Sequence, residues 1–192
     1  MTKVKCAQCG AFILEGTAAE TGGFCMPCKT GRRGSINQAK LSAQEKWESK
    51  SDPLVRLWRD LVWRAHHTQG GFDGLSEPEK QFYAVGTLDG DVYNGGFSQY
   101  FFNSSASHYD YAVAGLTEMG AAQACALLQR AKQVLFDFQD VPQGTAERRS
   151  LLAKIASQSR DGRLQQLDEL YWQDDDRLRS RSAAFASKNG LV

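Results

Sequence analysis

Two Cys-x-x-Cys pairs near the N-terminus constrain the fold of this chain more than any other feature. Cys6 and Cys9 form the first pair, fifteen residues follow, and Cys25 and Cys28 form the second pair. Each pair lets two thiolates reach one ion from a single tight turn, and two pairs complete the tetrahedron that zinc accepts. The spacing therefore predicts one structural zinc ion, because four thiolates leave no open position for a reacting water.

The residues around the cysteines predict a small zinc-ribbon-like or treble-clef-like module over residues 1–34. Ala11–Leu14 has the composition of a short strand, and Gly16, Gly22 and Gly23 are expected to supply turns before the second pair. So short a stretch with few large apolar side chains cannot bury a core without metal. Structural zinc contributes about 10–16 kcal/mol in comparable peptides, which is enough to fold them.

A redox dithiol and a disulfide are the alternatives to zinc. Redox Cys-x-x-Cys motifs usually occur singly within a βαβ pattern, and secreted scaffolds spread their cysteines through the chain. Neither description fits this sequence. Cys125 stands apart in a segment rich in Ala and Leu, where a lone cysteine is expected to be a small buried hydrophobe.

Composition favours a cytoplasmic protein, because no apolar run reaches the ~18 residues of a membrane span and the first residues lack a signal-peptide core. The charge is uneven. Residues 1–50 hold 8 Lys or Arg against 4 Asp or Glu, whereas residues 51–192 hold 15 against 18. Basic residues beside the cysteines, Lys29, Arg32 and Arg33, are candidates for contact with nucleic acid.

Residues 35–51 are expected to form a polar linker, and residues 52–192 a helical domain. Asp52 followed by Pro53 predicts a helix start. Apolar residues then recur at helical spacing on one stripe: Leu54, Leu57, Trp58, Leu61, Val62 and Ala65. Trp63 lies nearly opposite this stripe, where it either meets another layer of the same domain or marks an interface, and core packing is the expectation. His66 and His67 are expected to be polar residues at the helix end.

A capping box at Ser76–Glu79 predicts a second helix, which is expected to run towards Val92 and to stop at Asn94-Gly95-Gly96. Further helical character extends from Tyr111 to Phe138. The residues expected to share its buried face are Ala124, Leu127, Leu128, Ala131, Leu135 and Phe138.

Val141–Gly144 is expected to break the helical pattern, and a helix is predicted from Thr145 to about Asp161-Gly162. The last helix is indicated by Leu164, Leu167 and Tyr171. Asp174–Asp176 and the arginines that follow predict a solvated helix face with an Asp175–Arg179 pair. Because no run of alternating strands follows residue 30, the fold class expected is all-α, preceded by the small β module.

Residues 91–105 concentrate five aromatic side chains, amides and hydroxyls around two glycines. The glycines permit a sharp corner between helices, and Phe97, Tyr100 and Phe101 are expected to fill the core beneath it. The side chains of Asn94, Gln99 and Asn103 are expected to hydrogen-bond backbone groups at the corner. The segment is thus interpreted as a structural corner.

The same segment resembles a bacterial family named after a DNA-mimic protein, over approximately residues 53–180. The residues that carry the resemblance are Asn94, Gly95, Gly96, Phe97, Gln99, Tyr100, Phe101 and Asn103. The resemblance implies an all-α fold, homodimer formation as an expectation, and no known enzymatic activity. It also implies a mechanism, DNA mimicry. The family's named member uses an acidic surface to occupy the DNA-binding face of a transcription regulator.

A DNA mimic needs carboxylates spaced like phosphates in a negative field. The residues that could form such an acidic partner surface here are Asp168, Glu169, Asp174, Asp175 and Asp176. Arg177 and Arg179 interrupt them, and the net charge of residues 51–192 is only −3. The fold inference is unaffected by this charge, whereas the mimicry inference is weakened.

The leading functional hypothesis is a non-catalytic protein-interaction or regulatory protein, whose helical domain docks on a partner that the sequence does not identify. The alternative is a nucleic-acid-binding regulator acting through the basic zinc module. An enzyme ranks third, because the P-loop, His-Glu-x-x-His and Gly-x-Ser-x-Gly motifs are all missing. His108, beside Tyr109 and Asp110, is the one candidate acid or base.

Overall fold

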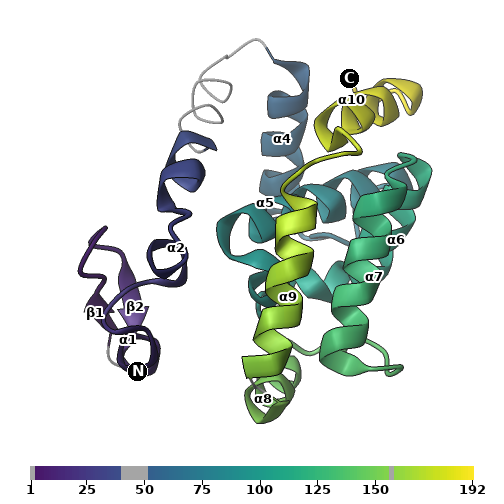
Figure 1. Cartoon of the computed structure of the whole chain (residues 1–192). Coiled ribbons are helices and arrows are strands. Elements are labelled where there is room, and N and C mark those ends of the chain that lie inside the picture. The colour runs from purple at the N-terminus through teal and green to yellow at the C-terminus, as the bar shows by residue number, and fades with distance from the viewer. Residues whose placement is uncertain (1–2, 40–51, 156–157) are drawn as a thin grey trace. The chain divides into compact units, whose positions relative to one another are not determined.

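The computed structural model describes residues 3–39, 52–155 and 158–192 (Figure 1). The chain divides into two compact units, residues 1–50 and 51–192. The first holds a two-stranded sheet and short helices, and the second is built from helices. The expected fold class, a helical domain preceded by a small β module, is confirmed. No helix within the described ranges is both long and apolar enough to cross a lipid bilayer.

The N-terminal unit begins with an antiparallel hairpin. Strand β1 (Lys3–Lys5) pairs with β2 (Phe12–Leu14), and Val4 lies opposite Ile13. Two short helices follow, α1 (Glu15–Thr21) and α2 (Met26–Lys29), and residues 33–39 are also helical. Helix formation therefore reaches into the predicted linker, whose residues 40–51 lie outside the described ranges.

The turn predicted at Gly16 is wrong, because Gly16 lies inside α1. The alanines that follow it favour a helix, and one glycine costs only about 1 kcal/mol. The chain turns instead at Gly22, whose φ of 69° is the left-handed conformation that closes a helix, and its N–H donates to the carbonyl of Ala18.

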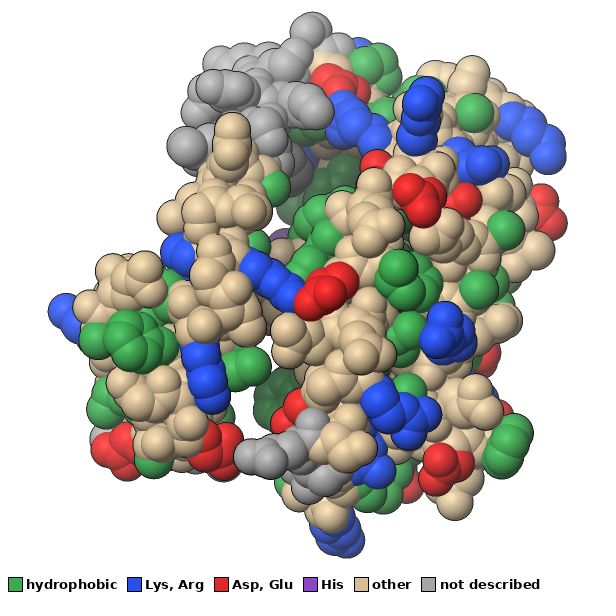
Figure 2. Space-filling view, in the orientation of Figure 1, with side chains coloured by type: hydrophobic (Ala, Val, Ile, Leu, Met, Phe, Trp, Pro, Cys, Tyr) green, Lys and Arg blue, Asp and Glu red, His purple; other side chains and the backbone are tan. Residues whose placement is uncertain are grey.

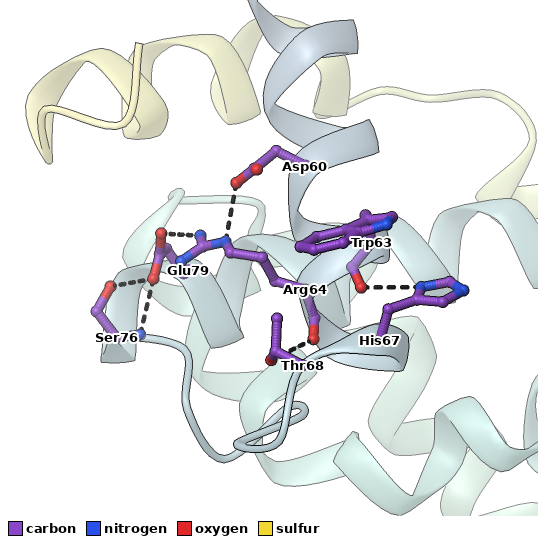
Figure 3. Close-up of polar contacts among 7 residues, drawn as sticks. All are labelled: Asp60, Trp63, Arg64, His67, Thr68, Ser76 and Glu79. Atoms are coloured by element: carbon purple, nitrogen blue, oxygen red, sulfur yellow. Dashed lines mark hydrogen bonds and ion pairs between the residues drawn. The ribbon is translucent and has the colours of Figure 1, made fainter.

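Helix α4 (Pro53–His67) opens the helical unit as predicted. The Asp52 side chain accepts a hydrogen bond from the Leu54 N–H at 2.9 Å, which caps the helix. Leu57 and Leu61 of the predicted stripe are buried. The expected burial of Trp63 is wrong: its side chain is 57% exposed and stacks on His67, with ring centroids 5.9 Å apart (Figure 3). Within the described residues, the core packs against the opposite side of α4.

Helix α5 (Glu77–Phe102) forms the centre of the helical unit and carries much of its core. Its capping box is confirmed, with the Ser76 N–H donating to Glu79 Oε2 at 2.8 Å. Glu79 also forms an ion pair with Arg64 of α4, and Arg64 Nε lies 2.8 Å from Asp60 Oδ2 (Figure 3). The Glu79 carboxylate therefore both caps α5 and links it to α4. The stop predicted at Asn94-Gly95-Gly96 is instead a kink, after which the helix continues.

The 3-10 turn η1 (Ser104–His108) leads into α6 (Tyr109–Glu118) and α7 (Ala122–Phe136). The helical region predicted from Tyr111 to Phe138 is thus two helices. Its predicted buried face is correct for the residues inside α7 and wrong for Phe138, which lies beyond the end of α7 and is 92% exposed. Cys125 is half-buried, with its Sγ 3.8 Å from Thr117 Oγ1.

Helix α8 (Thr145–Ile155) is followed by α9 (Gln158–Tyr171) and α10 (Leu178–Lys188), and α9 packs beside α7 (Figure 1). The helix end predicted at Asp161-Gly162 is wrong, because both residues lie inside α9. The segment Asp174–Asp176 is a turn between α9 and α10 and not a helix face. Arg179 pairs with Asp52 instead of Asp175.

Candidate metal centre and candidate partner surface

The structure brings the four predicted cysteine ligands together. All four Sγ atoms lie within 4.8 Å of one another, and the Sγ atoms of Cys9 and Cys25 are 3.6 Å apart. Thiolates at about 2.3 Å from a tetrahedral zinc ion are separated by about 3.8 Å. Cys6, Cys25 and Cys28 are buried, and Cys9 is exposed. The cluster therefore has the donor atoms and the size that one zinc ion requires.

Backbone hydrogen bonds shape each cysteine pair into a knuckle. In the first, the Gly10 N–H donates to the carbonyl of Cys6 at 2.9 Å. In the second, the Cys28 N–H donates to the carbonyl of Cys25 at 3.0 Å. The Cys25 N–H then donates to Cys6 Sγ at 3.2 Å and joins the two knuckles. That hydrogen bond lowers the pKa of Cys6 to about 6, which favours the thiolate form that binds metal.

The three basic residues proposed for nucleic acid differ in their surroundings. Arg33 Nη2 donates to Cys25 Sγ at 3.0 Å, and this contact, with that to Cys28, holds the pKa of the guanidinium above its usual range. Lys29 is exposed at the end of α2, and Arg32 is half-buried. Arg33 is therefore directed at the sulfur cluster, which leaves less positive charge available for phosphate.

Around the kink of α5, polar side chains converge on a residue that the sequence analysis overlooked. Asp91 accepts hydrogen bonds from Asn103 Nδ2 at 2.7 Å, from Gln99 Nε2 at 3.3 Å and from Ser105 Oγ. The expectation that Gln99 and Asn103 bind backbone groups is therefore wrong. The missed signal is an acid that precedes Gln99 by 8 residues and Asn103 by 12.

The kink itself is closed by α9. Gly96 has φ 77° and ψ −179°, a conformation that is essentially limited to glycine. The freed N–H of Phe97 donates to Asp168 Oδ1 at 2.8 Å, and Trp172 Nε1 donates to the carbonyl of Val92 at 3.1 Å. The expectation that the motif aromatics fill the core is confirmed, since Phe97, like Tyr100 and Phe101, is fully buried.

The end of α5 is held by Arg148, whose role the sequence analysis did not identify. Its side chain is fully buried. Nε donates to the carbonyl of Phe101 at 2.7 Å, and Nη2 to that of Asn103 at 2.6 Å. Nη1 donates to the carbonyl of Pro142 at 2.5 Å. A cation at a helix C-terminus satisfies its last carbonyls and its dipole, so Arg148 fixes the direction of the chain after α5.

The five acidic residues considered for a partner surface have mixed roles. Asp168 closes the kink. Asp174 Oδ1 accepts from the Leu178 N–H at 2.8 Å, and Asp176 Oδ2 accepts from the Ala124 N–H at 2.8 Å, so these two cap α10 and α7. Glu169 and Asp175 are exposed. Figure 2 shows blue and red side chains interspersed on the visible face of the helical unit.

His108, the candidate acid or base, is part of an aromatic cluster. Its ring stacks on Phe72 with centroids 3.6 Å apart, and burial lowers its pKa, which favours the uncharged ring. A depression on the helical unit lies elsewhere, lined by Gln123, Ala124, Leu127, Leu170, Tyr171, Asp174, Asp175, Asp176 and Leu178. It encloses about 10 Å³, which is room for about one water and not for a substrate.

Comparison with known proteins finds one family. A family model described as DMP19-like protein matches residues 73–189. The match covers the chain from the loop after α4 to the end of α10, and it leaves out the four cysteines. No curated protein and no solved structure gives a significant match.

Proposed function

This chain belongs to the DMP19-like protein family, and on that premise we propose that it is a non-catalytic regulatory protein whose helical domain docks on a partner protein. The observation that carries the proposal is the use of the motif's polar groups. The carboxylate of Asp91 is occupied by Gln99, Asn103 and Ser105. These side chains hold the kink of α5 and are not arranged around a reacting group, so the motif builds a scaffold.

A partner that normally binds DNA fits the family resemblance, and its basic surface would be met by exposed carboxylates. Glu169, Asp174 and Asp175 are the exposed members of the acidic set. Asp174 and Asp176 also accept backbone hydrogen bonds at the starts of α10 and α7. We therefore assign the docking surface to the C-terminal end of α9 and the turn that follows it.

The N-terminal module is proposed to hold one structural zinc ion through Cys6, Cys9, Cys25 and Cys28 and to add a second contact with the partner. The four thiolates fit the ion in number, size and softness. Nucleic-acid binding through the same module is the competing function. It is less favoured because Arg33, one of the three basic residues considered for phosphate, donates to a ligand sulfur instead.

The test is a pull-down of the tagged full-length protein from native lysate, with and without nuclease, identified by mass spectrometry. We expect one partner protein to be captured in a stoichiometric amount, and we expect nuclease treatment to leave that capture unchanged. Neutralising Glu169 and Asp175 together should weaken its capture about tenfold. The matched control neutralises two exposed acids of α6, Asp110 and Glu118, and should leave capture unchanged.

Two results would contradict the proposal. Capture that disappears with nuclease and with loss of Cys6 and Cys9 would assign the function to nucleic-acid binding by the module. Equal capture of the partner by both double variants would show that the docking surface does not lie at the end of α9. The expected homodimer is checked on the same sample by light scattering after gel filtration.

A further inference from the structure

Arg33 lies against the sulfur cluster in a way that its place in a basic segment does not suggest. Its Nη2 is 3.0 Å from Cys25 Sγ, and its Nε is shielded from solvent. The Cys25 N–H donates to Cys6 Sγ at 3.2 Å, so two different ligand sulfurs each receive a hydrogen bond. Of the two donors, the arginine is the one that also brings a charge.

The charge matters because three of the four ligands are buried. A zinc ion with four thiolates has a net charge of −2, and burying an uncompensated charge is costly. One guanidinium in direct contact reduces the total to −1. Lys29, four residues earlier in the sequence, is exposed at the end of α2, and within the described part of the chain it makes no contact with a sulfur.

The chain path after the second knuckle explains how Arg33 reaches the sulfurs. The Gly31 N–H donates to the carbonyl of Cys28 at 3.1 Å, and the Arg32 N–H to that of Pro27 at 2.8 Å. These bonds fold the backbone against α2. Residues 33–39 are helical, and the Ile36 N–H donates to the carbonyl of Arg32 at 3.0 Å. The contact from Arg33 thus joins the first turn of that helical segment to a metal ligand.

We propose that Arg33 is a positioning residue of the metal centre, which compensates the charge of the thiolates and makes the order of residues 33–39 depend on metal occupancy. This inference rests on the proposed zinc site. Groups that hydrogen-bond to metal ligands contribute strongly to metal retention, and their loss typically weakens affinity 10–100-fold. The helical segment that leads away from the module is then sensitive to whether the metal is bound.

The test uses the full-length chain with Co(II) as the probe, followed by competition with Zn(II). Arg33→Gln removes the charge, Arg33→Lys restores it without the planar fork, and Lys29→Gln is the control of equal charge change. We expect Arg33→Gln to weaken Co(II) binding 10–100-fold and to shift the sulfur-to-cobalt charge-transfer band. Arg33→Lys should recover part of both effects, and Lys29→Gln should match the unaltered protein.

Amide exchange of residues 33–39 supplies a second readout. With Zn(II) bound, exchange should be slow in the unaltered protein and fast in Arg33→Gln, while a chelator should make both fast. Identical affinity, band and exchange for Arg33→Gln and Lys29→Gln would overturn the role of Arg33 and leave the metal site intact. If the unaltered protein gives no tetrathiolate cobalt spectrum, the metal site and this inference both fail.

Discussion

The carboxylate of Asp168 in α9 accepts a hydrogen bond from the backbone N–H of Phe97, 2.8 Å away at the kink of α5. The bond joins residues 71 positions apart in the sequence. It satisfies a donor that the kink removes from the helical ladder. The bend in the central helix and the placement of α9 are therefore parts of one arrangement.

Replacing Gly96 by Ala tests this relationship. A Cβ at that position would fall against the Asp168 carboxylate, and the backbone conformation is itself restricted to glycine. We expect a loss of at least about 1–3 kcal/mol in the free energy of unfolding, measured by urea denaturation. Gly90→Ala is the control, because Gly90 lies in the same helix with open space around it. It should stabilise the protein by about 0.5–1 kcal/mol. Equal effects of the two substitutions would refute the argument.

Replacing Arg148 by Met should destabilise the helical unit by about 3 kcal/mol. The change removes the guanidinium hydrogen bonds to the carbonyls of Phe101, Asn103 and Pro142, which are buried or partly buried. The neighbouring Arg149→Met is the matched control. Arg149 is exposed, donates to the carbonyl of Phe102 and lies over its ring, so its loss should cost below about 1 kcal/mol. Thermal unfolding of both variants at one pH checks the difference, and similar midpoints would count against the capping role of Arg148.

A pH dependence is expected from Asp89. Burial raises its pKa from 3.8 to about 6. The hydrogen bond from Tyr171 lowers the pKa and the negative charge of nearby Asp174 raises it, but both effects are smaller than that of burial. The folded protein therefore holds a proton that the unfolded chain releases. The resulting stability is fully present below pH 3.8 and is lost as the pH rises through about 6.

The measurement is the difference in unfolding free energy between Asp89→Asn and the unaltered protein at several pH values. The amide stays neutral, so the advantage of Asp89→Asn should grow by about 2 kcal/mol between pH 4 and pH 7.5. The companion substitution Asp175→Asn, at an exposed carboxylate, should show no such growth. A constant difference for Asp89→Asn would mean that this carboxyl is not desolvated.

The sequence predicted those features that depend on local chemistry. The cysteine spacing indicated the cluster, Asp52-Pro53 and Ser76–Glu79 indicated helix starts, and the aromatics after Gly96 were correctly expected in the core. Each depends on a few neighbouring residues, whose preferences are expressed wherever the segment lies.

The errors concern features that depend on residues distant in the sequence. Trp63 was expected to pack in a core although it lies opposite the apolar stripe, yet the core packs against the other side of α4. Asp176 belongs to a charged run, but the N-terminus of α7 lies within reach of its carboxylate. Arg148 resembles its neighbour Arg149 in sequence, and only the fold buries one of them. Such partners are selected by tertiary packing, which periodicity does not report.

Native mass spectrometry of the purified full-length chain gives its metal content and so tests the four-cysteine zinc site itself. The account predicts one zinc ion per chain in the unaltered protein and in Cys125→Ser, whose sulfur is not in the cluster. It predicts none after Cys6 and Cys9 are both replaced by Ser, with the far-ultraviolet helical signal of residues 51–192 retained. A metal-free unaltered chain with four free thiols in the module, or zinc retained by the double variant, would contradict it.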